Sequence, residues 1–199
     1  MPDHCSCSTC NHADRRKFLK YLVGAASFGL AATVGTNPAL AEKKIFKSPK
    51  ALVLSCIDYR ILEAERYFLS LQNLGNLYDM TALAGSSLAL SGVPHQSDAM
   101  AFWDQLDISY RLHHIKKVII LDHQDCAAFA YKIDPQLSED PVLELKTHQE
   151  YLSRAHWAIR DKYPDLNIEL YFVNLNADVK PIEALAKATS SVNPPAKVA

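Results

Sequence analysis

Short apolar runs alternate along the chain with longer segments in which apolar residues recur every three or four positions. The apolar runs, each of strand length, are residues 50–55, 77–85, 116–122 and 167–175. The segments with helical periodicity are residues 61–75, 97–112 and 141–163. Gly75 is predicted to end the first helix. Strands that alternate with helices need crossover connections, so the pattern predicts an α/β fold with a mainly parallel central sheet of about four strands flanked by helices.

Reactive side chains follow two of the predicted strands directly. Cys56 comes after the first run, and His123 and Cys126 come after the third. Reactive groups of such folds collect at the carboxyl ends of the strands, so these three side chains converge if the two strands are neighbours. Two thiolates and one imidazole form a three-ligand set for a tetrahedral zinc ion with one open position, as in catalytic zinc sites. The pattern therefore predicts one Zn²⁺ per chain.

Asp58 and Arg60 lie at the next alternate positions after Cys56. The fixed fork of an arginine can hold a carboxylate through two hydrogen bonds. Held in this way, Asp58 would leave the open zinc position free and orient a water molecule; released, it could cap the zinc. The alternative is a surface ion pair that contributes ~0–1 kcal/mol. The position of both residues beside a ligand favours the catalytic interpretation.

The first residues of the chain have the pattern of a targeting segment. Arg15 and Arg16 precede an apolar run rich in Gly and Ala, and a small-x-small cleavage pattern closes it at Ala39–Ala41. The arginine pair resembles a twin-arginine export signal, which predicts a periplasmic or otherwise exported protein that uses the twin-arginine export machinery. After cleavage of residues 1–41 no stable membrane insertion is expected; an uncleaved anchor is the alternative.

The remaining boundaries follow from composition. Residues 42–49 are predicted to be a short linker, residues 50–188 a single catalytic domain, and residues 189–199 a flexible tail rich in small residues and proline. The chain has 21 Lys and Arg against 22 Asp and Glu. This balance offers no basic stripe to neutralise phosphates, so nucleic acid is not expected as a partner.

The cysteines leave a second interpretation open. Cys5, Cys7 and Cys10 resemble a metal-binding tract, but they precede the arginine pair and would be lost with the signal. Cys56 and Cys126 would then be the two cysteines left in an oxidising compartment, where an even number of cysteines indicates a disulfide. A disulfide, however, explains neither His123 nor the Asp58 and Arg60 pair.

At these residues the chain resembles the β-class carbonic anhydrases. The segments "CIDYR" and "HQDC" are similar to the Cys-x-Asp-x-Arg and His-x-x-Cys signatures of that family. The resemblance implies a zinc ion held by Cys56, His123 and Cys126 on a parallel α/β sheet in a homodimer. It implies the reversible hydration of carbon dioxide to bicarbonate, with Asp58 and Arg60 as the gating dyad.

The sequence departs from this family at several positions. Asp122 and Ala127 stand where the family has glycines, and Ser86 stands where it has asparagine. By the same resemblance, the turn formed by Ala84, Gly85 and Ser86 is expected to contact substrate. Ile57, Tyr59 and Leu83 are expected to form a small apolar pocket for carbon dioxide.

Two classes of function remain open from the sequence. The first is a zinc lyase that acts on carbon dioxide, or a hydrolase of an analogue such as carbonyl sulfide. The second is a non-catalytic exported domain with structural zinc or a Cys56–Cys126 disulfide. Replacement of Asp58 by Asn distinguishes them, because only the enzyme loses turnover while it retains the metal.

Overall fold

The structure is a computed structural model that describes residues 47–93 and 95–187. The predicted signal segment 1–41, most of the linker 42–49 and the tail 189–199 lie outside the described residues. Within the described part, five strands form one sheet in the order β2-β1-β3-β4-β5. The strands are β1 Ala51–Ser55, β2 Tyr78–Ala82, β3 Lys117–His123, β4 Asn167–Val173 and β5 Val179–Ile182.

The first four strands run parallel, and β5 pairs antiparallel with β4 at the edge of the sheet. The predicted α/β fold with a mainly parallel sheet is therefore confirmed, but the prediction missed β5. That strand is short and partly exposed, and it contains Pro181. Proline cannot donate to a strand ladder and is confined to edges, so the segment lacked the apolar run that marked the other strands.

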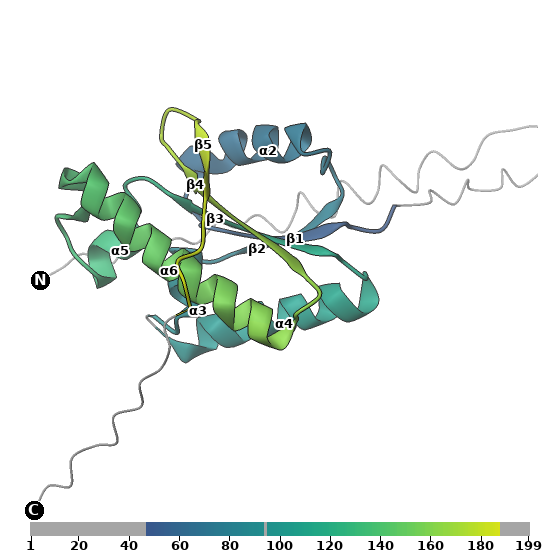
Figure 1. The fold of residues 1–199 in the computed structure, drawn as a ribbon. Helices are drawn as coiled ribbons and strands as arrows, with labels where there is room; N and C mark the ends of the chain where they lie inside the picture. The colour runs from purple at the N-terminus through teal and green to yellow at the C-terminus, as the bar shows by residue number, and fades with distance from the viewer. Residues whose placement is uncertain (1–46, 94, 188–199) are drawn as a thin grey trace, which may run out of the picture. The chain divides into compact units, whose positions relative to one another are not determined.

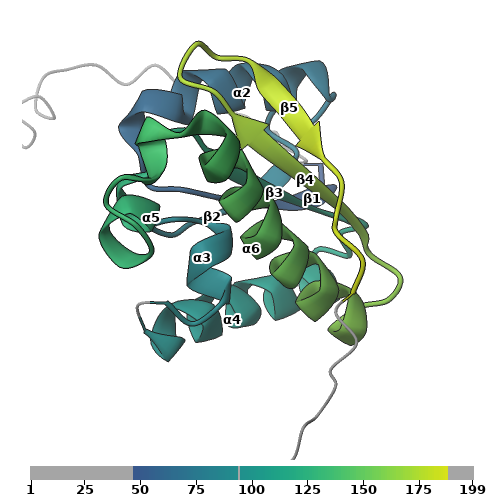
Figure 2. The same cartoon turned by 60° about the vertical axis from the view of Figure 1, so that its left-hand side comes forward.

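The helices cover both faces of the sheet (Figures 1 and 2). They are α2 Leu62–Leu71, α3 Ser87–Leu90, α4 Gln96–Leu112, α5 Ala127–Lys132 and α6 Pro141–Lys162, with 3₁₀ turns η1 Tyr59–Ile61 and η2 Leu137–Glu139. The three long helices were predicted; the short α3 and α5 were not. No helix within residues 47–93 and 95–187 is long and apolar enough to cross a membrane.

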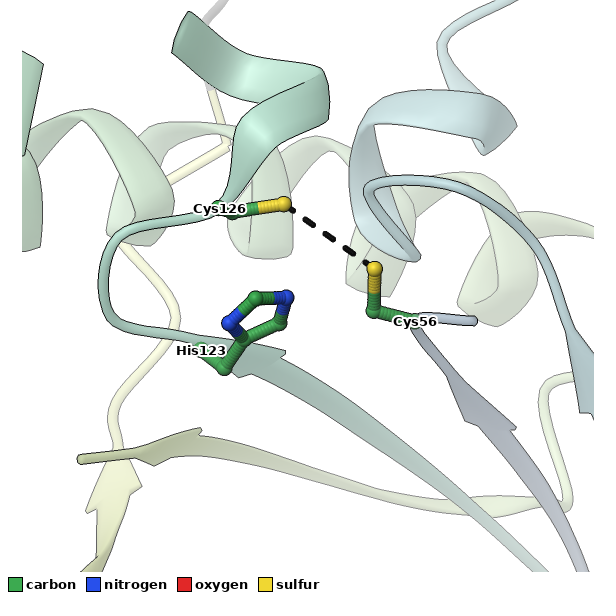
Figure 3. Close-up of side chains that lie close together, drawn as sticks. All are labelled: Cys56, His123 and Cys126. Carbon is green, nitrogen blue, oxygen red and sulfur yellow. Dashed lines mark hydrogen bonds between the residues drawn. The ribbon is translucent and has the colours of Figure 1, made fainter. Parts of the chain in front are cut away.

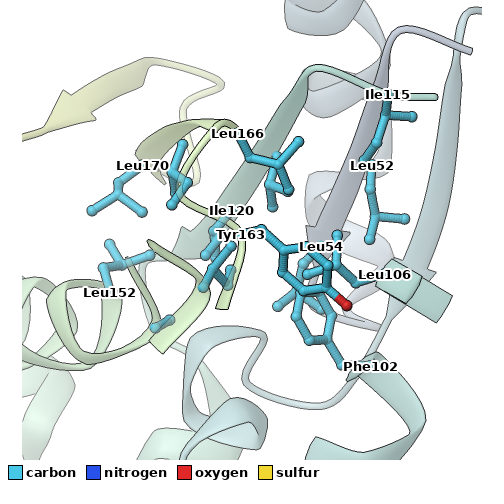
Figure 4. Packing of buried hydrophobic residues seen from close by; sticks show 14 residues of the cluster. Leu52, Leu54, Phe102, Leu106, Ile115, Ile120, Leu152, Tyr163, Leu166 and Leu170 are labelled. Carbon is cyan, nitrogen blue, oxygen red and sulfur yellow. The ribbon is translucent and has the colours of Figure 1, made fainter. Parts of the chain in front are cut away.

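Alternate residues of β1 face two separate cores. Leu52 and Leu54 pack with the buried residues of α4 and α6, as Figure 4 shows. Ala51 and Val53 pack in the second cluster with Leu69 of α2. A strand covered by helices on both faces buries every position, which is why the sequence of β1 is a nearly continuous apolar run without polar alternation.

Local signals explain where the helices begin and end. Asp140 caps α6, because its side chain accepts hydrogen bonds from the N–H groups of Val142 and Leu143. The prediction that Gly75 ends α2 is wrong. Asn73 adopts the left-handed conformation with φ 58°, and the N–H of Leu74 reaches back to the carbonyl of Leu69. This is the hydrogen-bond pattern of a Schellman cap, in which asparagine can replace glycine.

Candidate metal centre

The carboxyl ends of β1 and β3 bring the three predicted ligands together. The two strands are hydrogen-bonded neighbours, and their successors β2 and β4 lie on opposite sides, so the chain reverses its winding direction between them. Ligands of open α/β sheets bind at such a switch point. Cys56 follows β1, and His123 ends β3 three residues before Cys126. Their donor atoms all lie within 4.8 Å of one another, and all three side chains are buried (Figure 3).

His123 presents a free nitrogen to this cluster. Its Nδ1–H donates to the carbonyl of Gln124 at 2.8 Å. This bond assigns the proton to Nδ1 and leaves the lone pair of Nε2 available. Nε2 is buried and has no hydrogen-bond partner among the described residues. A buried nitrogen without a partner costs free energy unless a cation occupies the site, so His123 fits a metal ligand.

The two sulfur atoms lie 4.0 Å apart, and both cysteines are free thiols. The hydrogen bond between them lowers the pKa of Cys56 and raises the pKa of Cys126, and the N–H of Gly85, 3.3 Å from the Cys56 sulfur, lowers the pKa of Cys56 further. Burial opposes the charged form of His123, but the neighbouring Cys56, the carbonyl of Gln124 and Asp58 together raise its pKa. The surroundings of Cys56 therefore favour its thiolate, which is the form of cysteine that binds a metal.

Gly85 is required at its position by two constraints. Its φ is +78°, a conformation that other residues rarely adopt. A Cβ atom there would lie 3.1 Å from the Cβ atoms of Ala128 and Leu88. The close approach allows the backbone to donate to Cys56. Gly85 thus acts on a ligand sulfur, whereas the sequence predicted that it contacts substrate.

Asp58 and Arg60 form the predicted pair beside the cluster. Nε and Nη2 of Arg60 donate to both carboxylate oxygens of Asp58, at 2.8 to 3.1 Å. These bonds lower the pKa of Asp58 to about 2, so Asp58 is ionised at any physiological pH. Its Oδ2 lies 3.9 Å from Nε2 of His123. The carboxylate therefore stands next to the donor cluster while it is held by the guanidinium.

An open cavity of about 640 Å³ adjoins Cys56 and Asp58. Ile57, Tyr59, Ala84 and Tyr131 contribute to its apolar wall. Two of the three predicted pocket residues thus lie where expected, but Leu83 does not: it packs against the core on the α4 and α6 side. Of the predicted substrate turn, only Ala84 lines the cavity, because Ser86 is buried with its hydroxyl directed to the carbonyl of Leu54.

The structure explains the residues that replace the family glycines. Asp122 is buried and points away from the ligand cluster. Its carboxylate accepts hydrogen bonds from the backbone and hydroxyl of Ser87 and from Nδ1 of His148. Ala127 is the first residue of α5 and lines the cavity. Asp122 therefore ties α3 and α6 to the end of β3.

Sequence reasoning missed three further carboxylates around the cluster. Asp125 lies between His123 and Cys126 and contacts Arg60. Glu144 of α6 accepts the N–H of Asp125, and Glu65 of α2 accepts the hydroxyl of Ser55. Asp125 could have been noticed from its place inside the "HQDC" motif. The partners of Glu144 and Glu65 come from other elements, and no spacing in the sequence indicates them.

Together, the fold and the cluster define an α/β protein with a Cys-His-Cys centre able to hold a metal at the switch point of its sheet. A family described as putative carbonic anhydrase matches residues 46–183. The match covers more than half of the chain, so the chain belongs to this family.

Individual relatives are distant. An uncharacterized protein of Rickettsia bellii is 28% identical over 155 residues, which are 72% of this chain and 94% of the relative. The crystal structure of the β-carbonic anhydrase CafA of Aspergillus fumigatus has a TM-score of 0.48 and 16% identity, over 71% of this chain and 78% of that one. A tetrameric β-carbonic anhydrase from Sordaria macrospora has a TM-score of 0.49 and 10% identity, over 68% and 81%.

Proposed function

We propose that this protein is a zinc-dependent lyase that interconverts carbon dioxide and bicarbonate. The observation that carries the proposal is the buried convergence of Cys56, His123 and Cys126 with Nε2 of His123 unpartnered. Membership of the putative carbonic anhydrase family supports it. These three residues would hold the zinc, which, when bound, supplies the Lewis acidity that makes water nucleophilic near neutral pH.

The residues of the chain itself have distinct tasks in this reaction. Ionised Asp58 accepts a hydrogen bond from the attacking water and so orients its lone pair toward the substrate carbon. Arg60 holds that carboxylate in place. The apolar wall formed by Ile57, Tyr59 and Tyr131 suits an uncharged substrate.

The apolar wall of the cavity supports a second candidate substrate. Carbonyl sulfide, like carbon dioxide, is an uncharged linear molecule that such a wall admits. A more polarisable analogue of carbon dioxide such as carbonyl sulfide would gain contact with that wall. Parallel assays of carbon dioxide hydration and carbonyl sulfide hydrolysis decide between the two by their kcat/KM values.

Replacement of Asp58 by Asn tests whether the site is catalytic. The amide keeps the shape of the side chain but loses the charge, so we expect about a 100-fold loss of kcat, within the range for a group that positions a proton. Zinc content should remain at the wild-type level. The matched control is Asp161→Asn, which removes an exposed ion pair with Lys187 and should leave kcat unchanged. Unaltered turnover in Asp58→Asn would leave a non-catalytic domain as the better account.

We further propose that residues 1–41 direct export by the twin-arginine route and are then removed. The sequence of the segment supports this, as does the start of the family match at residue 46, beyond the predicted cleavage site. The paired change Arg15→Lys and Arg16→Lys should retain the precursor in the cytoplasm. The exported wild-type protein should begin at Glu42 on N-terminal sequencing, and an exported protein that still begins at Met1 contradicts cleavage.

A homodimer is part of the same proposal. Tyr59 and Tyr131 are about four-fifths exposed at the mouth of the cavity, and Ile57 beside them is 64% exposed. Large apolar side chains gathered at one opening are typical of a surface that another protein covers. Light scattering of the purified protein should give twice the chain mass, and Tyr131→Arg should lower it; a monomeric wild-type protein contradicts the proposal.

A further inference from the structure

Arg60 binds more than its predicted partner. Besides the bonds to Asp58, its Nη1 donates to the carboxylate of Asp125 at 2.8 Å, and its Nη2 donates to the carbonyl of Asp125 at 2.8 Å. Asp125 belongs to the loop that carries His123 and Cys126, whereas Arg60 belongs to the segment that carries Cys56. The guanidinium thus bridges the two segments that supply the ligands.

The opposite side of the same loop is held as well. The N–H of Asp125 donates to the carboxylate of Glu144 at 2.6 Å, and Glu144 is 3% exposed on α6. The φ of Asp125 is +53°, so the loop turns through the left-handed conformation at this residue, which aspartate adopts more readily than most residues. This turn lies between His123 and Cys126, which face one point although they are only three residues apart.

From this geometry we infer that Asp125 is a positioning residue for the metal, and that the Arg60–Asp125 bridge determines how firmly the metal is retained. The inference rests on the proposed zinc site. A guanidinium is planar and presents its donors in a fixed fork, so Arg60 cannot move relative to Asp125 without losing hydrogen bonds. Separation of the two segments would break this bridge, so the bridge opposes any opening of the ligand set that releases the metal. Asp58 acts on the reaction, and Asp125 acts on the retention of the metal.

The test is the rate at which a chromogenic chelator removes zinc from the full-length, zinc-loaded protein. Asp125→Gly removes the side-chain bond but suits the positive φ, so its thermal unfolding midpoint should stay within about 3 °C of wild type. We expect zinc release to become about tenfold faster, as for the loss of other groups that orient metal ligands. Asp125→Asn keeps an oxygen that accepts from Nη1, so its release rate should change less than about threefold.

Two further variants separate the bridge from the general effect of a glycine substitution at a positive φ. Asn76 also has a positive φ, 56°, but lies before β2 at the other end of the sheet, so Asn76→Gly should release zinc at the wild-type rate. Arg60→Lys keeps the charge and loses the fork, so it should release zinc at least as fast as Asp125→Gly. The double variant should then release zinc no faster than Arg60→Lys, because the lysine already lacks the contact that Asp125→Gly removes.

The results that overturn the inference differ from those that overturn the proposed function. Stoichiometric zinc with an unchanged release rate in Asp125→Gly, or rates that multiply in the double variant, would contradict the bridge and leave the zinc lyase intact. A wild-type protein that binds no zinc would contradict both.

Discussion

Two aspartates on either side of His123, Asp122 within β3 and Asp125 in the loop after it, have opposite surroundings. Asp122 precedes His123, is 1% exposed, and is enclosed by Ser87 and His148. Asp125 follows His123 by two residues, and its side chain is 48% exposed and bonded to Arg60. One carboxylate points into the core between α3 and α6, and the other faces the segment that carries Cys56.

The two surroundings give the two carboxylates different effects. A buried carboxylate whose partners are also buried stabilises the fold when all of its hydrogen bonds are made, and its loss leaves those partners without an acceptor. A half-exposed ion pair contributes little to the free energy of unfolding. We therefore expect removal of Asp122 to affect folding and removal of Asp125 to affect the metal.

The largest effect is expected for Asp122→Ala. The variant leaves the hydroxyl of Ser87 and Nδ1 of His148 buried without an acceptor, so the free energy of unfolding should fall by about 3 kcal/mol. Urea unfolding of wild type and variant at the same zinc concentration measures it. A loss under about 1 kcal/mol would show that water or a rearranged side chain replaces Asp122, and would contradict the claim that Asp122 matters more for stability than Asp125.

Glu65 is a second buried carboxylate, and its contribution to the free energy of unfolding depends on pH. Burial raises the pKa of Glu65 from its ordinary 4.5 to about 7. The folded state therefore holds its proton more tightly than the unfolded state, and the stability this provides is present below pH 4.5 and lost as the pH rises to about 7. Glu65→Gln does not titrate, so relative to wild type it should gain up to about 3 kcal/mol between these pH values. Chemical denaturation across this range measures the gain, and a constant difference contradicts the assigned pKa.

The smallest change in stability is expected for Asp125→Gly. Loss of a half-exposed ion pair and relief of a positive φ oppose each other, so the free energy of unfolding should stay within about 1 kcal/mol of wild type. The same urea experiment measures it. A loss as large as that of Asp122→Ala would remove the distinction between the two aspartates.

The parts of the fold that were predictable from sequence are those where burial determines residue type. The runs that became β1 and β3 are buried and mostly apolar because helices cover both faces of the sheet. The edge strand β5 escaped prediction because exposure and Pro181 remove that signal. The end of α2 was misplaced because Asn73 adopts the left-handed conformation that was expected near Gly75.

The same distinction holds at the candidate site. Cys56 follows β1, and His123 and Cys126 lie at the end of β3, so convergence was predicted on the condition that the two strands are neighbours. The structure pairs β1 with β3, and the convergence is confirmed. Asp122 is bonded to a side chain from α3, and Asp125 to one from α6. These helices are distant in the sequence from β3, so no fixed spacing in the sequence indicates the contacts. Zinc, catalysis and export remain predictions.

The zinc site formed by Cys56, His123 and Cys126 is tested most directly by the zinc content of the exported wild-type protein, purified without chelator and measured by mass spectrometry of the metal. We expect about one zinc per chain, as for a mononuclear site with three protein ligands. Absence of metal, with Cys56 and Cys126 unreactive toward thiol reagents until they are reduced, would mean that the two cysteines form a disulfide and would contradict the enzyme.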